Sequence, residues 1–192
     1  MAKTLLISPS YFIFLIFLIF SYATIPVFGE EYSYVKTMDL EKMNLPKEKV
    51  THFQLYWQDV VSGSNATSVT VLEGLNNSTF FGSVNIIDNS LTVEPNLSSK
   101  TVGKSQGLYA STGLEESSLL MVMNFAFTDG KYNGSTFTVV GRNNVNAEVR
   151  EMPIIGGSGL FRFARGYVLA STYSFSDNGD GTIEYNCYVI HH

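Results

Sequence analysis

From residue 50 onward, apolar residues alternate with polar ones or form short apolar runs, and turn-forming residues interrupt them at short intervals. The runs are rich in Val, Ile, Phe, Tyr and Thr, whereas Gly, Asn, Asp and Ser fill the interruptions. Since no stretch has the period of an amphipathic helix, the pattern is typical of an all-β domain. It predicts strands at 51–60, 68–73, 80–88, 102–112, 118–128, 135–141, 146–151, 160–175 and 182–190.

Three of these segments say more about how the sheet is built. The run 160–175 is so long that it favours a barrel or a strongly coiled sheet, and Asn178-Gly-Asp-Gly181 after it predicts a tight hairpin turn. The run 119–127 is apolar on both faces, which favours burial of its outer face between subunits. The glycines of 156–159 are interpreted as a turn through which the chain re-enters the barrel.

The N-terminal segment reads as a secretory signal peptide. Lys3 precedes an unbroken apolar run from Tyr11 to Phe20, and Val27-Phe-Gly29 offers a cleavage site. The run has about half of the roughly twenty residues needed to cross a bilayer, so we expect secretion to the extracellular space and no membrane anchor. The predicted organisation is a signal peptide at 1–29, a polar leader at 30–49 and one barrel domain at 50–192.

Charge and cysteine content narrow the class of protein. Cleavage removes Lys3 and no acidic residue, so the formal net charge moves from −5 to −6, and the mature part has no basic run. This argues against a nucleic-acid partner. Cys187 stands alone, so no intramolecular disulfide can form. Because His52 and the terminal His191-His192 do not form a ligand cluster, we expect no metal site.

Polar segments that read as turns carry five Asn-x-Ser/Thr sequons, which in a secreted chain are candidate glycosylation sites. Two of them overlap, so we expect only two or three to be occupied. The candidates are Asn65, Asn76, Asn77, Asn96 and Asn133.

The first predicted strand carries the most informative candidate for chemistry. Phe53, Leu55, Trp57 and Asp59 fall on one face at period two, so the carboxylate shares its side with apolar residues. A buried carboxylate is costly unless something holds it, which makes Asp59 a candidate site residue. The alternative is that Asp59 caps the turn 60–63.

Further polar and aromatic residues complete the candidate site. Tyr109 is able to hydrogen-bond a phenolic oxygen, or else it merely fills the barrel, and Arg165 either contributes to the site or pairs structurally with an acid. The rings of Phe53, Trp57 and Phe163 are predicted to stack a planar guest. No glycine-rich nucleotide motif opens a helix and no Gly-x-Ser-x-Gly elbow is present, so we expect no cofactor.

Three motifs carry a family resemblance. The start His52-Phe-x-x-Tyr-x-x-Asp59, the segment Gly107-Leu-Tyr109 and the block Gly156-Gly-Ser-Gly-Leu-Phe-Arg-Phe-Ala-Arg-Gly166 resemble the plant dirigent family, from about Lys49 to Ile190. The resemblance implies an eight-stranded antiparallel barrel of the dirigent and allene oxide cyclase type, assembled as a homo-oligomer, with a trimer favoured over a dimer, in the apoplast. A second cysteine, common near the start of mature dirigent chains, is missing here.

The resemblance also implies site residues. The family's first-strand aspartate falls on Asp59, its tyrosine on Tyr109 and its arginine on Arg150, while the position of its second aspartate holds Asn143. The implied function is stereoselective coupling of phenoxy radicals, such as those of coniferyl alcohol, into lignans, with a laccase or peroxidase as the radical source. The alternatives are a dehydratase that resembles pterocarpan synthase and acts on a hydroxyisoflavanol, and a non-catalytic barrel that binds phenolics or organises lignin.

Overall fold

The computed structural model describes residues 34–192, and their regular structure consists of β-strands and short 3₁₀ helices. No α-helix occurs among the described residues, in agreement with the all-β prediction. The elements in chain order are η1 (Leu40–Met43), β1 (Lys49–Asp59), β2 (Ser68–Leu72), β3 (Val84–Thr92), β4 (Thr101–Ser111), β5 (Ser118–Phe127), η2 (Gly130–Tyr132), β6 (Thr136–Asn144), β7 (Arg150–Ser158), η3 (Gly159–Phe161), β8 (Arg165–Phe175) and β9 (Gly181–His191).

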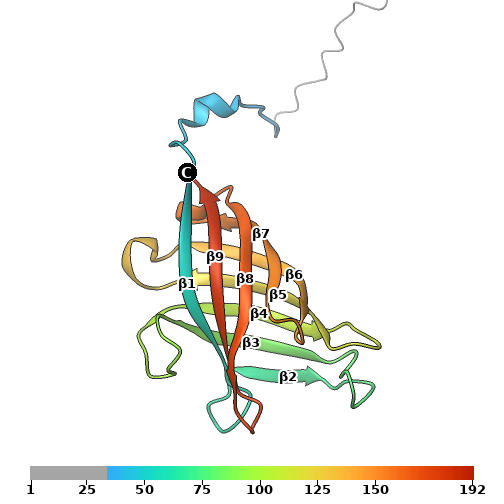
Figure 1. The fold of residues 1–192 in the computed structure, drawn as a ribbon. Helices are drawn as coiled ribbons and strands as arrows, with labels where there is room; N and C mark the ends of the chain where they lie inside the picture. Colours follow the sequence, from blue (N-terminus) through green and yellow to red (C-terminus); the bar gives the residue numbers. More distant parts are fainter. Residues whose placement is uncertain (1–33) are drawn as a thin grey trace, which may run out of the picture. The chain divides into compact units, whose positions relative to one another are not determined.

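Eight of the strands close into an antiparallel barrel. Their order is β1-β9-β8-β7-β6-β5-β4-β3, and β1 returns to pair with β3, with Trp57 opposite Leu91. The strands wrap around a common interior in Figure 1. The ninth strand, β2, pairs only with β3 and lies outside the closed ring. The predicted eight-stranded antiparallel barrel is therefore confirmed.

The strands β1 and β2 occupy successive parts of one edge of β3. Residues 56–58 of β1 pair with 90–92 of β3, whereas residues 68–72 of β2 pair with 84–87. Asp59 is the last residue of β1, so it lies where one partner of β3 leaves and the next one takes over. At this point the edge of β3 changes its partner from β1 to β2, so side chains of β1, β2 and β3 lie close together.

The glycine-rich block differs from its prediction. The predicted strand 146–151 is wrong, because β7 spans Arg150–Ser158 and the first three glycine-block residues belong to it. The predicted strand 160–175 is also shortened, since η3 occupies Gly159–Phe161 and β8 begins at Arg165. Gly159 and Phe163 both have φ of +62°, a left-handed conformation that ends an extended run. By contrast, the predicted antiparallel pairing of the last two strands is confirmed.

The interior of the barrel is packed more tightly at one end than at the other. At the end where β1 and β6 begin, Phe53 contacts Phe127, Phe137 and Phe161 with ring centroids 5.0–6.1 Å apart. Aromatic pairs at such distances favour tilted and edge-on arrangements, as seen here. This aromatic cluster fills the interior at one end of the barrel.

The segment before the barrel is a separate unit, Met1–Asn44, of which residues 34–44 are described. Residues 34–44 contain the single turn η1, beside which Lys42 and Asp39 form an exposed ion pair of 2.9 Å. The predicted signal peptide at 1–29 lies outside the described residues. Over residues 34–192, no helix combines the length and apolar character that a membrane span requires.

Candidate functional site

A pocket with a volume of about 510 Å³ opens at the end of the barrel opposite the aromatic cluster. It lies where β1, β4, β6 and β8 end and where β5, β7 and β9 begin. Such a volume is typical of sites for small organic ligands. Most of the wall surface is apolar, although about half of the lining residues have a polar or charged side chain. They include Trp57, Asp59, Phe80, Asn85, Tyr109, Leu119, Met121, Asn143, Arg150, Thr172, Phe175 and Ile183.

Asp59 is a buried carboxyl group in this pocket, with 8% of its surface exposed. Asn89 donates a hydrogen bond of 2.9 Å from Nδ2 to its Oδ1, and the Tyr109 hydroxyl lies 3.4 Å from its Oδ2 as a donor. Burial raises the pKa of Asp59, while the hydrogen bonds from Asn89, Ser68 and Tyr109 oppose that rise only in part. Asp59 is therefore suited to exchange a proton with a bound molecule.

A polar network from the start of β2, from β3 and from β4 holds this carboxyl group in place. The hydroxyl of Thr67 donates to Oδ1 of Asn89 over 2.5 Å, which leaves the amide nitrogen of Asn89 directed at Asp59. Ser68 and Tyr109 share a hydrogen bond of 3.0 Å between their hydroxyl groups. Asn89 is completely buried, so its hydrogen bonds with Thr67 and Asp59 are shielded from water. They hold the Asp59 side chain in one orientation.

Arg150 lies in the same pocket without an acidic partner. Its Nη1 donates to the carbonyl oxygen of Ala147 over 3.3 Å and to the hydroxyl of Thr172 over 2.9 Å, and both acceptors are neutral. None of the ion pairs of the described residues includes Arg150. Burial lowers the pKa of Arg150, although a guanidinium group remains charged. The pocket thus contains a buried cation that forms no ion pair with residues 34–192.

Several polar atoms at the pocket wall have no hydrogen-bond partner in the protein. Among the described residues, four buried side-chain atoms lack one, and three of them belong to pocket residues: Trp57 Nε1, Asn143 Oδ1 and Arg150 Nε. Buried polar atoms are usually paired, since an unpaired one costs about 1–3 kcal/mol. Their concentration in one pocket favours a polar ligand there.

The structure brings five of the predicted site residues together. Trp57, Asp59, Tyr109, Asn143 and Arg150 all line the pocket, although they come from four strands. The sequence pattern placed only Trp57 and Asp59 on a common face. The other three meet them because the closed ring brings the ends of β4 and β6 and the start of β7 to the same opening.

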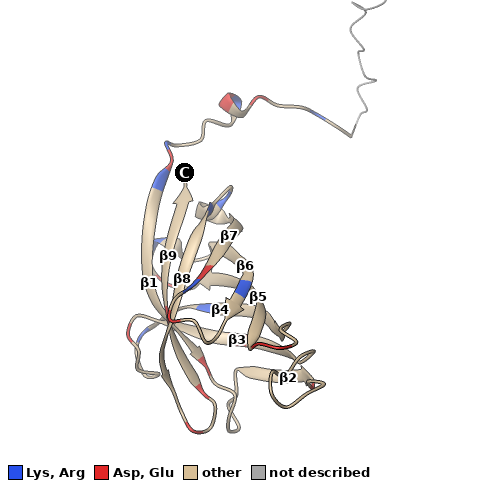
Figure 2. Ribbon diagram, turned by 45° about the vertical axis from the view of Figure 1, so that its right-hand side comes forward, with Lys and Arg blue, Asp and Glu red and all other residues tan. Residues whose placement is uncertain are grey.

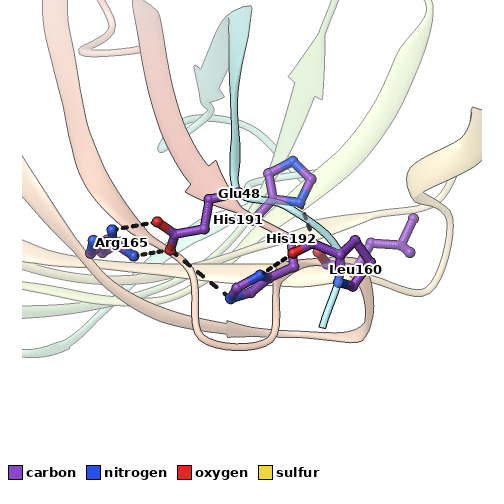
Figure 3. Close-up of polar contacts among 6 residues, drawn as sticks. Glu48, Leu160, Arg165, His191 and His192 are labelled. Carbon is purple, nitrogen blue, oxygen red and sulfur yellow. Dashed lines mark hydrogen bonds and ion pairs between the residues drawn. The ribbon is translucent and has the colours of Figure 1, made fainter. Parts of the chain in front are cut away.

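The predicted placement of Phe53 and Arg165 at the ligand is wrong, because both lie at the closed end. Phe53 belongs to the aromatic cluster. Arg165 forms a two-bond ion pair with Glu48, as Figure 3 shows, so the structural alternative stated for Arg165 holds. The same view shows the C-terminal histidines beside this pair, with His191 bonded to the carbonyl oxygen of Leu160 over 2.9 Å.

Phe163 is likewise not a pocket residue. It follows η3, has 51% of its surface exposed and adopts a left-handed backbone conformation. The chain reverses here between β7 and β8, so the residue that was predicted to lie on a continuous strand instead belongs to the connection. The predicted stacking role of Phe163 is therefore wrong.

Two alternatives stated for the site are also resolved. The turn after β1 is capped by Asp180 and not by Asp59, because Asp180 accepts hydrogen bonds from the backbone nitrogens of Val61 and Ser62, each of 2.9 Å. Tyr109 does more than fill the barrel, since its hydroxyl group joins Ser68 to Asp59. Asp59 is thereby left free of a capping role.

Sequence reasoning missed Asn89 and Ser68, which hold the Asp59–Tyr109 pair. The sequence does contain a signal for Asn89. In β3, Asn85 and Asn89 lie on the same face as the apolar residues Ile87 and Leu91, at period two. A polar residue on an otherwise apolar face is the same feature that drew attention to Asp59.

The candidate glycosylation sites lie in loops, as predicted, but they differ in access. Asn65, Asn77, Asn96 and Asn133 are exposed, whereas Asn76 is half-buried. Oδ1 of Asn76 accepts a hydrogen bond of 2.8 Å from the backbone nitrogen of Thr79, so Asn77 is the more accessible of the overlapping pair. Their occupancy stays a prediction.

Charged residues are dispersed over the described part of the molecule. In Figure 2 the Lys and Arg positions occur singly along the strands and loops and do not gather into one patch. Within residues 34–192, no group of three or more His, Cys, Asp or Glu side chains has the arrangement of a metal site.

Comparison with known proteins gives consistent matches. The family model described as "Dirigent-like protein" matches residues 50–190. Dirigent protein 7 of Arabidopsis thaliana is 56% identical over 161 residues, covering 83% of this chain and 87% of that protein. Pterocarpan synthase 1 of Glycyrrhiza echinata is 45% identical over 165 residues, covering 83% and 88%. The solved structure of the pterocarpan synthase dirigent protein GePTS1 is similar with a TM-score of 0.73 and 45% identity, covering 77% of this chain and 87% of that one.

Proposed function

This chain belongs to the dirigent family, and from that premise we propose that it binds phenolic molecules in the pocket and sets the stereochemistry of bond formation between phenoxy radicals. A separate oxidase, such as a laccase or a peroxidase, supplies the radicals. The observation that carries the proposal is the buried Asp59 carboxyl group, held by Tyr109 and Asn89 in a largely apolar pocket.

In this proposal the pocket acts mainly by orientation. Coupling of two phenoxy radicals forms a new carbon–carbon bond and leaves quinone methides, which close when a hydroxyl oxygen attacks the methide carbon. Asp59 donates its proton to the quinone methide oxygen and recovers a proton from the attacking hydroxyl group. A difference of about 1.4 kcal/mol between two bound poses gives a tenfold ratio of products.

A second candidate function is a dehydratase like the pterocarpan synthases, acting on a hydroxyisoflavanol. The observation that favours it is that Asp59 is the one buried carboxyl group in the pocket; the other acid of the wall, Glu73, is exposed. A reaction that needs a single acid fits this arrangement better than one that uses two, since Asn143 replaces the second.

The dehydration balances with Asp59 as its acid. Asp59 protonates the leaving hydroxyl group, the C–O bond breaks and water departs, while a ring phenol loses its proton and becomes the quinone methide oxygen. A second phenol of the same molecule then attacks the methide carbon through its oxygen and loses its proton. Of the two protons released by the two phenols, one returns to the quinone methide oxygen and the other to Asp59. The net change is the loss of one water, and no oxidant is required.

We also propose that the protein is secreted, glycosylated and homo-oligomeric, with a trimer favoured. The outer face of the sheet supports assembly, because Ile86, Leu108, Val122 and Val140 follow one another across β3, β4, β5 and β6. A continuous apolar row on the outside of a barrel favours burial against another subunit. Light scattering of the purified protein measures the mass of the assembly, and a monomer would contradict this part of the proposal.

One experiment separates the two functions and the non-catalytic alternative. The purified protein is incubated with coniferyl alcohol plus a laccase, and in parallel with a hydroxyisoflavanol and no oxidase, and chiral chromatography resolves the products. Enantiomeric excess in the first incubation supports stereoselective coupling, and turnover in the second supports the dehydratase. Racemic product in the first and no turnover in the second would leave a phenolic-binding barrel without chemistry.

A further inference from the structure

Two of the unpartnered polar atoms in the pocket have complementary chemistry. Arg150 Nε is a hydrogen-bond donor and Asn143 Oδ1 is an acceptor, and neither atom has a partner among the described residues. Both residues are more than nine-tenths buried. Asn143 is the second-last residue of β6 and Arg150 is the first residue of β7, so the hairpin of two neighbouring strands brings them to the same end of the barrel wall.

From this pair we propose that the Asn143–Arg150 end of the pocket is a subsite that recognises a free hydroxyl group of the substrate and discriminates against its methyl ether. The inference deepens the proposed function and rests on it, since it specifies which phenolic molecules the pocket accepts. It assigns Asn143 a role in specificity, separate from the proton transfer at Asp59.

The reason is the number and kind of hydrogen bonds that each ligand group can make. A hydroxyl oxygen accepts a bond from Arg150 Nε and donates its own hydrogen to Asn143 Oδ1, so one group satisfies both atoms. A methoxy or keto oxygen accepts from Arg150 but leaves Asn143 Oδ1 unpaired in a buried site. A carboxylate also lacks a hydrogen for Asn143. Only the hydroxyl group removes both desolvation costs.

The identity of residue 143 decides how this subsite works. An aspartate here would place a negative charge beside a guanidinium group and so provide an ion pair for Arg150. The amide of Asn143 carries no charge. The hydrogen-bond acceptors of Arg150, the carbonyl of Ala147 and the hydroxyl of Thr172, are neutral as well. The cation therefore remains available to a bound oxygen, and it stabilises the negative charge that develops when the recognised phenol loses its proton.

The test measures binding, so it does not depend on turnover. The probes are coniferyl alcohol and its 4-O-methyl ether, which differ by one methyl group on the phenolic oxygen, and isothermal titration gives both dissociation constants. We expect the wild-type protein to bind the phenol at least tenfold more tightly. Asn143→Leu, which has a similar size and no acceptor, should reduce the ratio to about threefold or less. Asn143→Asp should also reduce it, because its carboxylate would pair with Arg150 and take the cation away from the bound oxygen.

The matched control is Asn124→Leu, an equivalent change at an exposed position of β5 outside the pocket, which should leave the ratio unchanged. Equal binding of the two probes by wild type, or an unchanged ratio in Asn143→Leu, would overturn the hydroxyl subsite and leave the phenolic pocket standing. Failure of both probes to bind would instead remove the proposed coupling of coniferyl alcohol radicals, and the subsite with it. Circular dichroism shows that each variant is folded before its ratio is interpreted.

Discussion

Replacing Asp59 with Asn removes the proton from the pocket while preserving the shape of the side chain. The amide oxygen still accepts the bond from Asn89, and the amide nitrogen faces the Tyr109 hydroxyl, which can accept from it while donating to Ser68. We therefore expect Asp59→Asn to fold normally. Its effect on chemistry should be large, because the other acid of the pocket wall, Glu73, is exposed.

The expected loss follows from the role of a single general acid. Such a group contributes about 10²- to 10⁴-fold, which corresponds to about 3–5 kcal/mol of activation free energy. The assay is the rate and enantiomeric excess of product formation by wild type and Asp59→Asn under identical radical supply, or without oxidase for the dehydration. A variant with a rate within about threefold of wild type and the same enantiomeric excess would refute the assignment of Asp59.

The same variant makes a second prediction about stability. Burial raises the pKa of Asp59 above its ordinary value of 3.8, so folding favours the protonated form. The contribution of Asp59 to stability is therefore fully present below pH 3.8 and is lost as the pH rises through the raised pKa. Since Asn does not titrate, thermal melts should show Asp59→Asn gaining Tm relative to wild type as the pH rises. A constant difference between pH 3 and 8 would contradict the raised pKa.

Three further changes test other parts of the structure. Tyr109→Phe removes a donor that lowers the pKa of Asp59, so the basic limb of the pH–rate profile should move to higher pH; an unmoved limb would return Tyr109 to a filling role. Gly107→Ala should destabilise the fold by about 1–3 kcal/mol in denaturant titration, because the added Cβ would lie 2.0 Å from the carbonyl oxygen of Val122. Arg165→Ala removes an exposed ion pair at the closed end, so thermal melts should show a Tm close to that of wild type and the product stereochemistry should be unchanged.

The period-two pattern predicted a shared face correctly, but it did not predict a shared site. Phe53 and Asp59 lie on the same face of β1, yet six residues at about 3.3 Å each separate them by about 20 Å. Phe53 therefore lies at the closed end of the barrel, whereas Asp59 lies at the open end. Alternation reports which way a side chain points, whereas its depth depends on where the strand enters and leaves the ring.

The glycine block shows a second limit of sequence reasoning. Glycines were interpreted as turn residues, and Gly159 is one, with φ of +62°. Gly157, however, lies within β7, where a Cβ would be 2.5 Å from the carbonyl oxygen of Thr136 and 2.6 Å from that of Phe161. This glycine permits close backbone packing, and composition alone does not separate that role from a turn.

The polar partners of Asp59 depend on pairing register, which no local pattern encodes. Asn89 reaches Asp59 because β1 leaves β3 just where Asn89 lies, between the residues paired with β1 and those paired with β2. A shift of one residue along β3 would turn Asn89 to the outside of the barrel. The carboxylate was therefore predictable from its own strand, whereas the group that orients it was not.

The two ends of the barrel depend on each other. At the closed end, Phe53, Phe137 and Phe161 fill the interior, whereas the pocket with Asp59 lies toward the other end. An aromatic molecule bound in this pocket displaces water from beside Asp59. Desolvation, the main cause of the raised pKa of Asp59, should then increase on ligand binding, so the carboxyl group is most strongly protonated when a substrate is present to receive its proton.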